Sequence, residues 1–152
     1  MKRLFLPFLA LAMILFPSLS QAASNVAVDT VAVQGYDLVS YHQGDGVPVK
    51  GNGNSFAYVD GVTYLFANTK NKNIFKANPE KYLPAYGGFC AYGVTKGKKF
   101  IGDPLVYRLV DGKLYLNLVP KVQKIWEKDV PGNIAKADGK WTSIKDKHAS
   151  DL

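Results

Sequence analysis

Two stretches of the chain are rich in β-branched and aromatic residues on either side of an Asp-Gly pair. The pairs are Asp60-Gly61 and Asp111-Gly112. The flanking runs are residues 55–59 and 62–66 for the first pair and residues 105–110 and 113–118 for the second. Asp-Gly is favoured in the two-residue type I′ turn, where both central residues need positive φ. The pattern therefore predicts two antiparallel β-hairpins.

Short helices are predicted between the hairpins and after the second one. Asn68 can cap a helix that contains Ile74 and Phe75 and ends at Asn78, because Pro79 disfavours helix at the residue before it. The later segment 120–126 begins with a proline, which suits a first helical turn, and carries an i, i+3, i+4 apolar stripe. A Pro-Gly pair at 131–132 is expected to separate this helix from a shorter helical turn.

Two shorter apolar runs, 38–41 and 47–50, predict further short strands before the Gly-Asn cluster at 51–54. Together with the hairpins and two to four short helices, they predict an α+β fold. The length fits one small domain over residues 23–144, followed by a polar tail, 145–152, that is expected to fray.

The N-terminus has the composition of a secretory signal peptide. A positive start with Lys2 and Arg3 precedes an apolar run from Leu4 to Phe16, and small residues Ser20 and Ala22 suit a signal peptidase. The run is shorter than the roughly 20 residues that span a bilayer. We therefore expect cleavage of residues 1–22, a periplasmic or secreted location, and no stable membrane insertion.

Charge and cysteine content narrow the function further. Loss of Lys2 and Arg3 lowers the formal net charge from +7 to +5, and the remaining lysines are dispersed, so no nucleic-acid partner is expected. Cys90 is the single cysteine, which excludes an intramolecular disulfide. In an oxidising compartment a lone thiol is exposed to mixed disulfides unless it is buried or bound to a metal.

Val62–Phe66, followed by Phe75–Tyr82 with its Asn-Pro-Glu-Lys-Tyr ending, resembles a YHS domain. This small module is associated with metal binding and occurs with copper-transporting ATPases and in some phenol hydroxylases. The rest of the chain resembles an exported, single-domain branch of that family, from about residue 30 to Trp141. The segments that carry this wider similarity are 35–37 with Tyr41, 86–91, 102–104, 111–117 and 131–134.

The chain departs from the family at the residues that would bind a metal. Metal-associated YHS domains commonly carry cysteines one and five residues after the last aromatic of the strand, and here those positions are Ala67 and Asn71. The family's metal binding therefore cannot be transferred through that thiolate pair. Cys90, in Tyr86-Gly87-Gly88-Phe89-Cys90-Ala91, is the thiol that this chain offers instead.

Cys90 has three interpretations: a buried inert thiol, a ligand for Cu(I), or a redox-active thiol at a helix start. A redox role lacks a second cysteine. For copper, His42 is the candidate second ligand, and His148 in the tail is a weaker one. A symmetric homodimer would alternatively bring two Cys90 thiolates together.

The tyrosines near Cys90 suggest an alternative function. They can simply pack the core, or they can line a pocket for a small ligand with Cys90 at its floor. The candidate pocket residues are Tyr41, Tyr86, Phe89 and Tyr92. The chain has no GxGxxG, P-loop, HExxH or GxSxG motif, so an enzyme is not expected. The leading hypothesis is an exported metal-binding module, for which the resemblance implies copper, and the alternative is a metal-free small-ligand or protein interaction module with an aromatic cleft.

Overall fold

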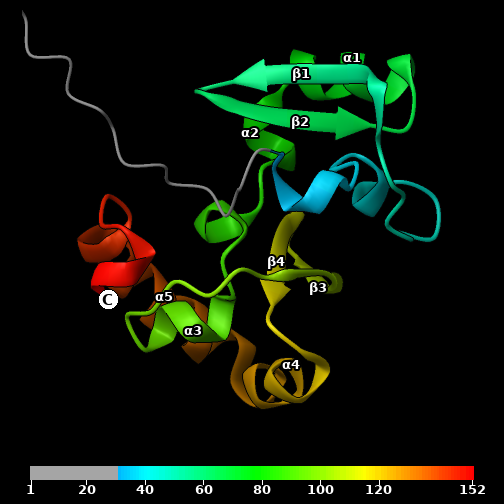
Figure 1. Cartoon of the computed structure of the whole chain (residues 1–152). Helices are drawn as coiled ribbons and strands as arrows, with labels where there is room; N and C mark the ends of the chain where they lie inside the picture. The colour runs from blue at the N-terminus through cyan, green and yellow to red at the C-terminus, as the bar shows by residue number, and fades with distance from the viewer. Residues whose placement is uncertain (1–30) are drawn as a thin grey trace, which may run out of the picture.

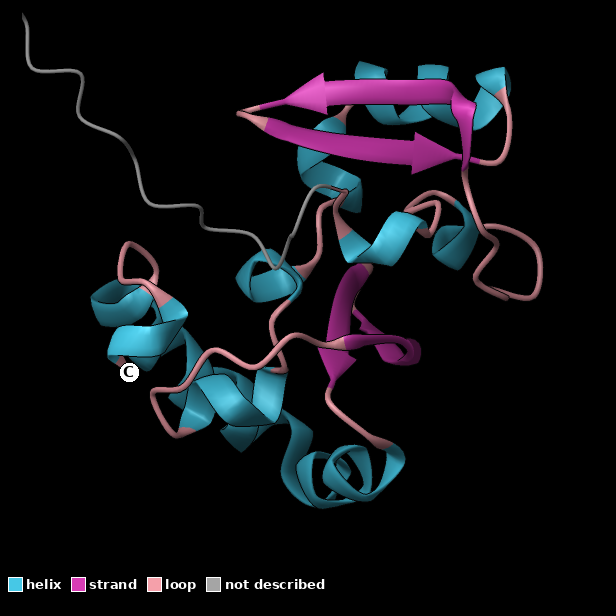
Figure 2. Cartoon of the chain, viewed as in Figure 1, coloured by secondary structure: helices cyan, strands magenta, loops and turns pink. Residues whose placement is uncertain are grey.

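The computed structural model describes residues 31–152, so the predicted signal peptide lies outside the described residues. The fold is α+β, as predicted (Figures 1 and 2). Each antiparallel hairpin forms its own two-stranded sheet. The strands are β1 (Asn52–Val59) and β2 (Val62–Phe66), followed later by β3 (Asp103–Val110) and β4 (Lys113–Asn117).

The hairpin turns have the backbone that the Asp-Gly pairs predict. Asp60 and Gly61 have φ values of 50° and 84°, and Asp111 and Gly112 have φ values of 50° and 75°. Positive φ at both central positions is the requirement of a type I′ turn, whose twist matches that of the flanking strands. Both predicted hairpins are confirmed.

The helices begin and end largely where the capping residues predict. Asn68 accepts a hydrogen bond from the backbone N–H of Asn71 at 2.9 Å, and the first helix ends before Asn78. The helices are α1 (Thr69–Ala77), α2 (Pro79–Tyr82), α3 (Ala91–Thr95), α4 (Pro120–Trp126) and α5 (Val130–Ile144). Short 3₁₀ turns lie at Val33–Gly35, Ser40–His42, Ala85–Gly88, Glu127–Asp129 and Ala149–Asp151.

The predicted strands at 38–41 and 47–50 were wrong. Leu38 and Val39 are fully buried, but they lead into the 3₁₀ turn Ser40–His42. Asp37 accepts a hydrogen bond from the N–H of Val39, and the Ser40 hydroxyl donates to the carbonyl of Asp37. These local bonds satisfy the backbone without a strand partner. In the second run, the backbone bridge at Lys50 pairs with Tyr36.

The Pro131-Gly132 pair starts a helix instead of dividing two short ones. The break falls earlier, at the 3₁₀ turn Glu127–Asp129, and α5 then runs for 15 residues. Asp129 caps α5 by accepting the N–H of Gly132 at 3.0 Å. Pro131 lies in the first turn, where its missing N–H costs nothing.

Within residues 31–152 the apolar side chains form two clusters that meet at β4. Leu114 and Leu116 belong to the first cluster, with Phe66 and Phe75, whereas Tyr115 belongs to the second, with Trp126. Successive residues of a strand point to opposite faces, so this one strand contributes to both clusters. Figure 1 shows β4 between the first hairpin and the helices α3 to α5.

The C-terminal residues are held against the second cluster. The buried Lys99 ammonium donates to the carbonyl oxygens of Lys145 and Lys147, both at 2.6 Å. It also lies 5.4 Å from the centre of the Trp141 ring. The segment expected to fray is thus anchored at its start. Among residues 31–152 no helix is long and apolar enough to cross a membrane.

Candidate functional site

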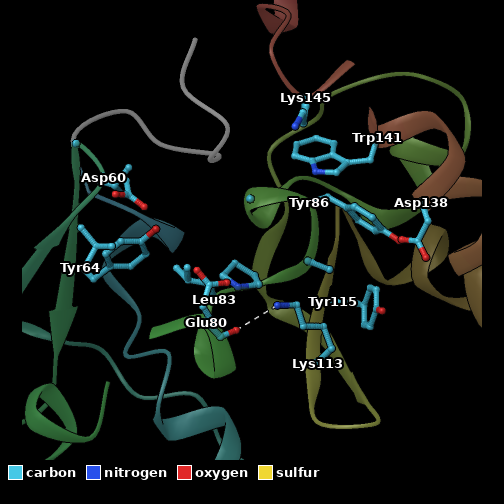
Figure 3. Close-up of a pocket in the computed structure, with 16 residues that line it drawn as sticks. Asp60, Tyr64, Glu80, Leu83, Tyr86, Lys113, Tyr115, Asp138, Trp141 and Lys145 are labelled. Carbon is cyan, nitrogen blue, oxygen red and sulfur yellow. Dashed lines mark hydrogen bonds between the residues drawn. The ribbon is translucent and has the colours of Figure 1, made fainter. Parts of the chain in front are cut away.

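A cleft of about 990 Å³ separates the turn of the first hairpin from helix α5 (Figure 3). We call it the aromatic cleft, because three tyrosines and a tryptophan line it. Its lining comprises residues 59–62, Tyr64, Glu80, residues 83–87, Lys113, Tyr115, Asp138, Trp141 and Lys145. Segments up to 86 residue positions apart therefore contribute to one hollow.

Four different elements position the rings. Tyr64 lies on β2, Tyr115 on β4 and Trp141 on α5, while Tyr86 lies on the 3₁₀ turn Ala85–Gly88. The Tyr86 ring centroid is 5.9 Å from that of Tyr115 and 5.7 Å from that of Trp141. Figure 3 shows Tyr64 on the opposite side of the cleft, next to Asp60. Tilted or edge contacts of this kind fix aromatic rings in one orientation.

Tyr86 has a backbone conformation that disfavours a side chain. Its φ is 54°, and Gly87 and Gly88 follow with φ values of 61° and 84°. A non-glycine residue in this left-handed region costs about 1–2 kcal/mol. The Tyr86 hydroxyl donates to the Asp138 carboxylate at 2.8 Å, which holds the ring against α5. Strain of this kind persists where the surrounding structure enforces it, and it is concentrated at functional sites.

The tyrosine hydroxyls of the cleft stay protonated at neutral pH. Burial, with a smaller effect of Asp60, raises the pKa of Tyr64 to about 12. Burial and then the hydrogen bond to Asp138 raise the pKa of Tyr86. Burial also raises the pKa of Tyr115. The rings therefore present neutral faces and hydrogen-bonding hydroxyls, not phenolate charges.

Cys90 occupies a structural position outside this lining. Its side chain is 1% exposed and caps α3, with Sγ accepting the N–H of Gly93 at 3.4 Å. Sγ also donates to the Asn117 side-chain oxygen at 3.7 Å, and that oxygen accepts the N–H of Tyr92 at 3.3 Å. The Tyr92 bond fixes which end of the Asn117 amide faces the thiol.

His42 lies in different surroundings. Its ring packs edge-on against Tyr82, with centroids 5.1 Å apart. Burial, followed by the charges of Lys81 and Lys113, lowers the pKa of His42. Its Nε2 atom is buried and has no hydrogen-bond partner among the described residues. His148, the weaker candidate, is exposed and bonds to Ser150 through Nδ1 at 2.8 Å.

The surroundings of Cys90 fit a structural thiol better than a copper ligand. Metals bind the deprotonated thiolate. Deprotonation of Cys90 would remove the S–H donor of its hydrogen bond to Asn117 and leave a negative sulfur facing an oxygen. The described part of the chain contains no cluster of three or more His, Cys, Asp or Glu side chains able to hold a metal ion. The Cys90 thiol forms hydrogen bonds with Gly93 and Asn117, whereas the His42 ring packs on Tyr82.

Ala67 and Asn71, where the resemblance to YHS domains would place cysteines, belong to a hydrogen-bond network. Asp37 is fully buried, and its Oδ2 accepts the N–H of Ala67 at 2.9 Å and the side-chain amide of Asn71 at 2.7 Å. A buried carboxylate needs such donors. The Asp37 carboxylate thus ties α1 to the segment before it.

Of the four pocket residues expected from the sequence, Tyr86 lines the aromatic cleft. Tyr41 is instead fully buried in the first cluster, and its hydroxyl donates to the carbonyl of Pro104 at 2.9 Å. Phe89 is buried beside Trp141, with centroids 6.3 Å apart. Tyr92 packs at the edge of the second cluster. These three rings serve packing, and Cys90 is not the floor of the cleft.

The sequence analysis missed Tyr64, Tyr115 and Trp141 as cleft residues. A signal was present, since Tyr64 and Tyr115 each stand three residues after the glycine of an Asp-Gly turn. That equivalence places each tyrosine at the same position of its hairpin. Only the tertiary arrangement brings the two hairpins and α5 to one cleft.

Comparison of the chain with known protein families, with curated proteins and with solved structures gave no match. The resemblance to YHS domains therefore stays a prediction.

Proposed function

We propose that this protein is an exported, non-catalytic binding module that takes a small ligand in the aromatic cleft. The observation that carries the proposal is Tyr86, a non-glycine residue held in a left-handed conformation at the cleft wall. Its hydroxyl is fixed by Asp138 at 2.8 Å. A residue with a strained backbone and a side chain held by a hydrogen bond is consistent with a preorganised binding site.

The size and chemistry of the cleft support the same proposal. Ligand sites typically have volumes of about 300–1,000 Å³ and combine aromatic walls with a few polar groups. The cleft measures about 990 Å³ and combines Tyr64, Tyr115 and Trp141 with carboxylates and lysines. The rings are fixed by packing, so a ligand would not bear the entropic cost of ordering them.

A fragment screen observed by NMR tests this proposal. Aromatic and aliphatic fragments are added to the ¹⁵N-labelled exported protein, and binding should shift the amides of residues 59–64, 83–87 and 138–145. Tyr64→Leu should weaken the hits at least tenfold. Tyr58→Leu is the matched control, because Tyr58 lies on the same hairpin but is 69% exposed and outside the cleft lining. Hits that map elsewhere on the molecule would refute the proposal.

Copper binding through Cys90 and His42 stays a separate hypothesis, favoured by the resemblance and by the unpartnered Nε2 of His42 among the described residues. Cu(I) is titrated against the protein in competition with a chelator, with Cys90→Ser as the comparison. Our assignment of Cys90 as a structural residue expects equal affinities. A tenfold loss in the variant would restore the copper site, and sedimentation with Cu(I) would show whether two copies share it.

A further inference from the structure

The lining of the aromatic cleft contains more acidic side chains than lysines. Its lining carries the carboxylates of Asp60, Glu80 and Asp138 and the ammonium groups of Lys113 and Lys145. Lys113 already donates to the backbone carbonyl of Glu80 at 3.4 Å, as Figure 3 shows. Lys145 also has an interaction partner. Both ammonium groups keep their charge, so the lining carries one more negative than positive group.

We propose that the ligand is a small organic cation, such as a quaternary ammonium or a protonated amine with an apolar body. This proposal rests on the proposed binding function. Aromatic faces attract such cations through the ring quadrupole, by about 0.5–1 kcal/mol at exposed sites and about 2 kcal/mol when desolvated. Tyr64 and Tyr115 line the cleft with neutral rings, of which only an edge is open because these residues are 4% and 8% exposed.

The carboxylates of Asp60 and Glu80 would attract a cation over a longer range than the rings do. Asp60 lies at the hairpin turn next to Tyr64, and Glu80 lies at the start of α2 below it (Figure 3). Asp138 is committed in part to Tyr86, so its role is to hold that ring. Tyr64 and Tyr86 line opposite sides of the cleft, and the carboxylates of Asp60 and Glu80 belong to the same lining (Figure 3).

Trp141 lines one wall of the cleft, and its fluorescence can report ligand binding. One interaction of its ring is already made by Lys99, whose Nζ lies 5.4 Å from the ring centre. This contact shows that the Trp141 ring accommodates an ammonium group, and Lys99 itself lies outside the cleft lining. The chain's other tryptophan, Trp126, is fully buried, so a fluorescence change on ligand addition reports mainly Trp141.

Three probes of nearly equal shape separate charge from shape. They are choline, its neutral carbon isostere 3,3-dimethyl-1-butanol, and the anion 3,3-dimethylbutanoate. Each is titrated into the exported protein, with Trp141 fluorescence and amide shifts of residues 59–64 and 83–87 as readouts. Choline should bind at least tenfold more tightly than the neutral alcohol, and the anion should bind most weakly. Added salt should weaken choline alone.

Variants test the carboxylates. Asp60→Asn combined with Glu80→Gln should weaken choline at least fivefold and leave the neutral alcohol unchanged. Asp45→Asn is the matched control, because Asp45 is an exposed acid outside the cleft lining. Equal or tighter binding of the neutral or anionic probe would overturn the cation proposal while leaving the binding function intact. Absence of any choline effect at the cleft also overturns it, and the fragment screen then decides the binding function independently.

Discussion

Asp37 joins separate parts of the first cluster through its carboxylate. The group is fully buried and accepts hydrogen bonds from the N–H groups of Val39 and Ala67 and from the amide of Asn71. Its partners Ala67 and Asn71 lie 30 and 34 residues further along the chain. These donors replace the water that a carboxylate loses on burial, so losing one of them should be costly.

Substitution at Asn71 tests that network. Asn71→Asp would put a second carboxylate against Asp37, and breaking such a buried arrangement typically costs about 3–5 kcal/mol. Urea unfolding measures the loss in the free energy of unfolding. Asn73→Asp adds the same charge to the same helix at an exposed position, where a change within about 0.5 kcal/mol is expected. Equal effects of the two variants would contradict the assigned role of Asp37.

His42 makes the stability depend on pH. Its folded-state pKa lies below the ordinary 6.5, because burial and then Lys81 and Lys113 disfavour the charged ring. The unfolded chain therefore binds more protons in this range, and the free energy of unfolding should fall as the pH drops below 6.5. Urea midpoints between about pH 8 and 5 measure the slope.

His42→Gln should make that slope shallower, because the variant has no imidazole to protonate. The control is His148→Gln, since His148 is exposed in the C-terminal segment and should leave the slope unchanged. If both variants keep the wild-type slope, another group governs the acid response.

At the scale of elements, the turn backbone and the cleft depend on left-handed residues. Both hairpin turns and the Tyr86-Gly87-Gly88 turn contain consecutive residues with positive φ. In the hairpins this conformation fixes the strand register, which sets Val59 opposite Val62 and Val110 opposite Lys113. The register in turn sends Tyr64 and Tyr115 to the faces on which they line the cleft.

Two glycines with open space around them should respond in opposite directions to alanine. A Cβ atom at Gly112 or at Gly139 would meet nothing within 4 Å. Gly112 has a φ of 75°, so Gly112→Ala should destabilise by about 1–2 kcal/mol. Gly139 lies within α5, where alanine should stabilise by about 0.5–1 kcal/mol. Thermal and urea unfolding measure both, and a shared sign would contradict the backbone argument.

At the scale of the whole molecule, β4 couples the two apolar clusters. Leu116 packs into the first cluster and Tyr115 into the second, from adjacent positions of one strand. A strand that is buried on both faces cannot unfold without exposing both clusters. The described residues 31–152 should therefore unfold as one cooperative unit, as small single domains usually do.

Leu116→Ala tests the coupling. Leu116 is 1% exposed, and such a truncation costs about 2–5 kcal/mol. Both tryptophans lie in or against the second cluster, so their fluorescence reports unfolding at a distance from the side chain removed. The fluorescence and far-ultraviolet circular dichroism midpoints should fall together. Leu105→Ala, 60% exposed on β3, is the control and should shift them little. Separate transitions would show independent clusters.

The local features of the fold could be predicted from short stretches of the chain. The Asp-Gly turns, the Asn68 cap and the proline at the start of α4 follow from the conformational limits of individual residues, so each could be predicted from a few neighbours. The strand predicted at 38–41 was wrong, because side-chain hydrogen bonds of Asp37 and Ser40 favour a 3₁₀ turn there.

The site is formed by contacts between segments that are distant along the chain. The buried Cys90 thiol bonds to Asn117, 27 residues away, and the aromatic cleft brings Tyr64, Tyr86 and Trp141 together from three elements. Such proximity arises from packing between distant segments, which no local pattern records. Cys90 stood out in the sequence because it is the single cysteine of the chain. The fold enclosed that thiol and left the tyrosines and Trp141 facing a shared hollow.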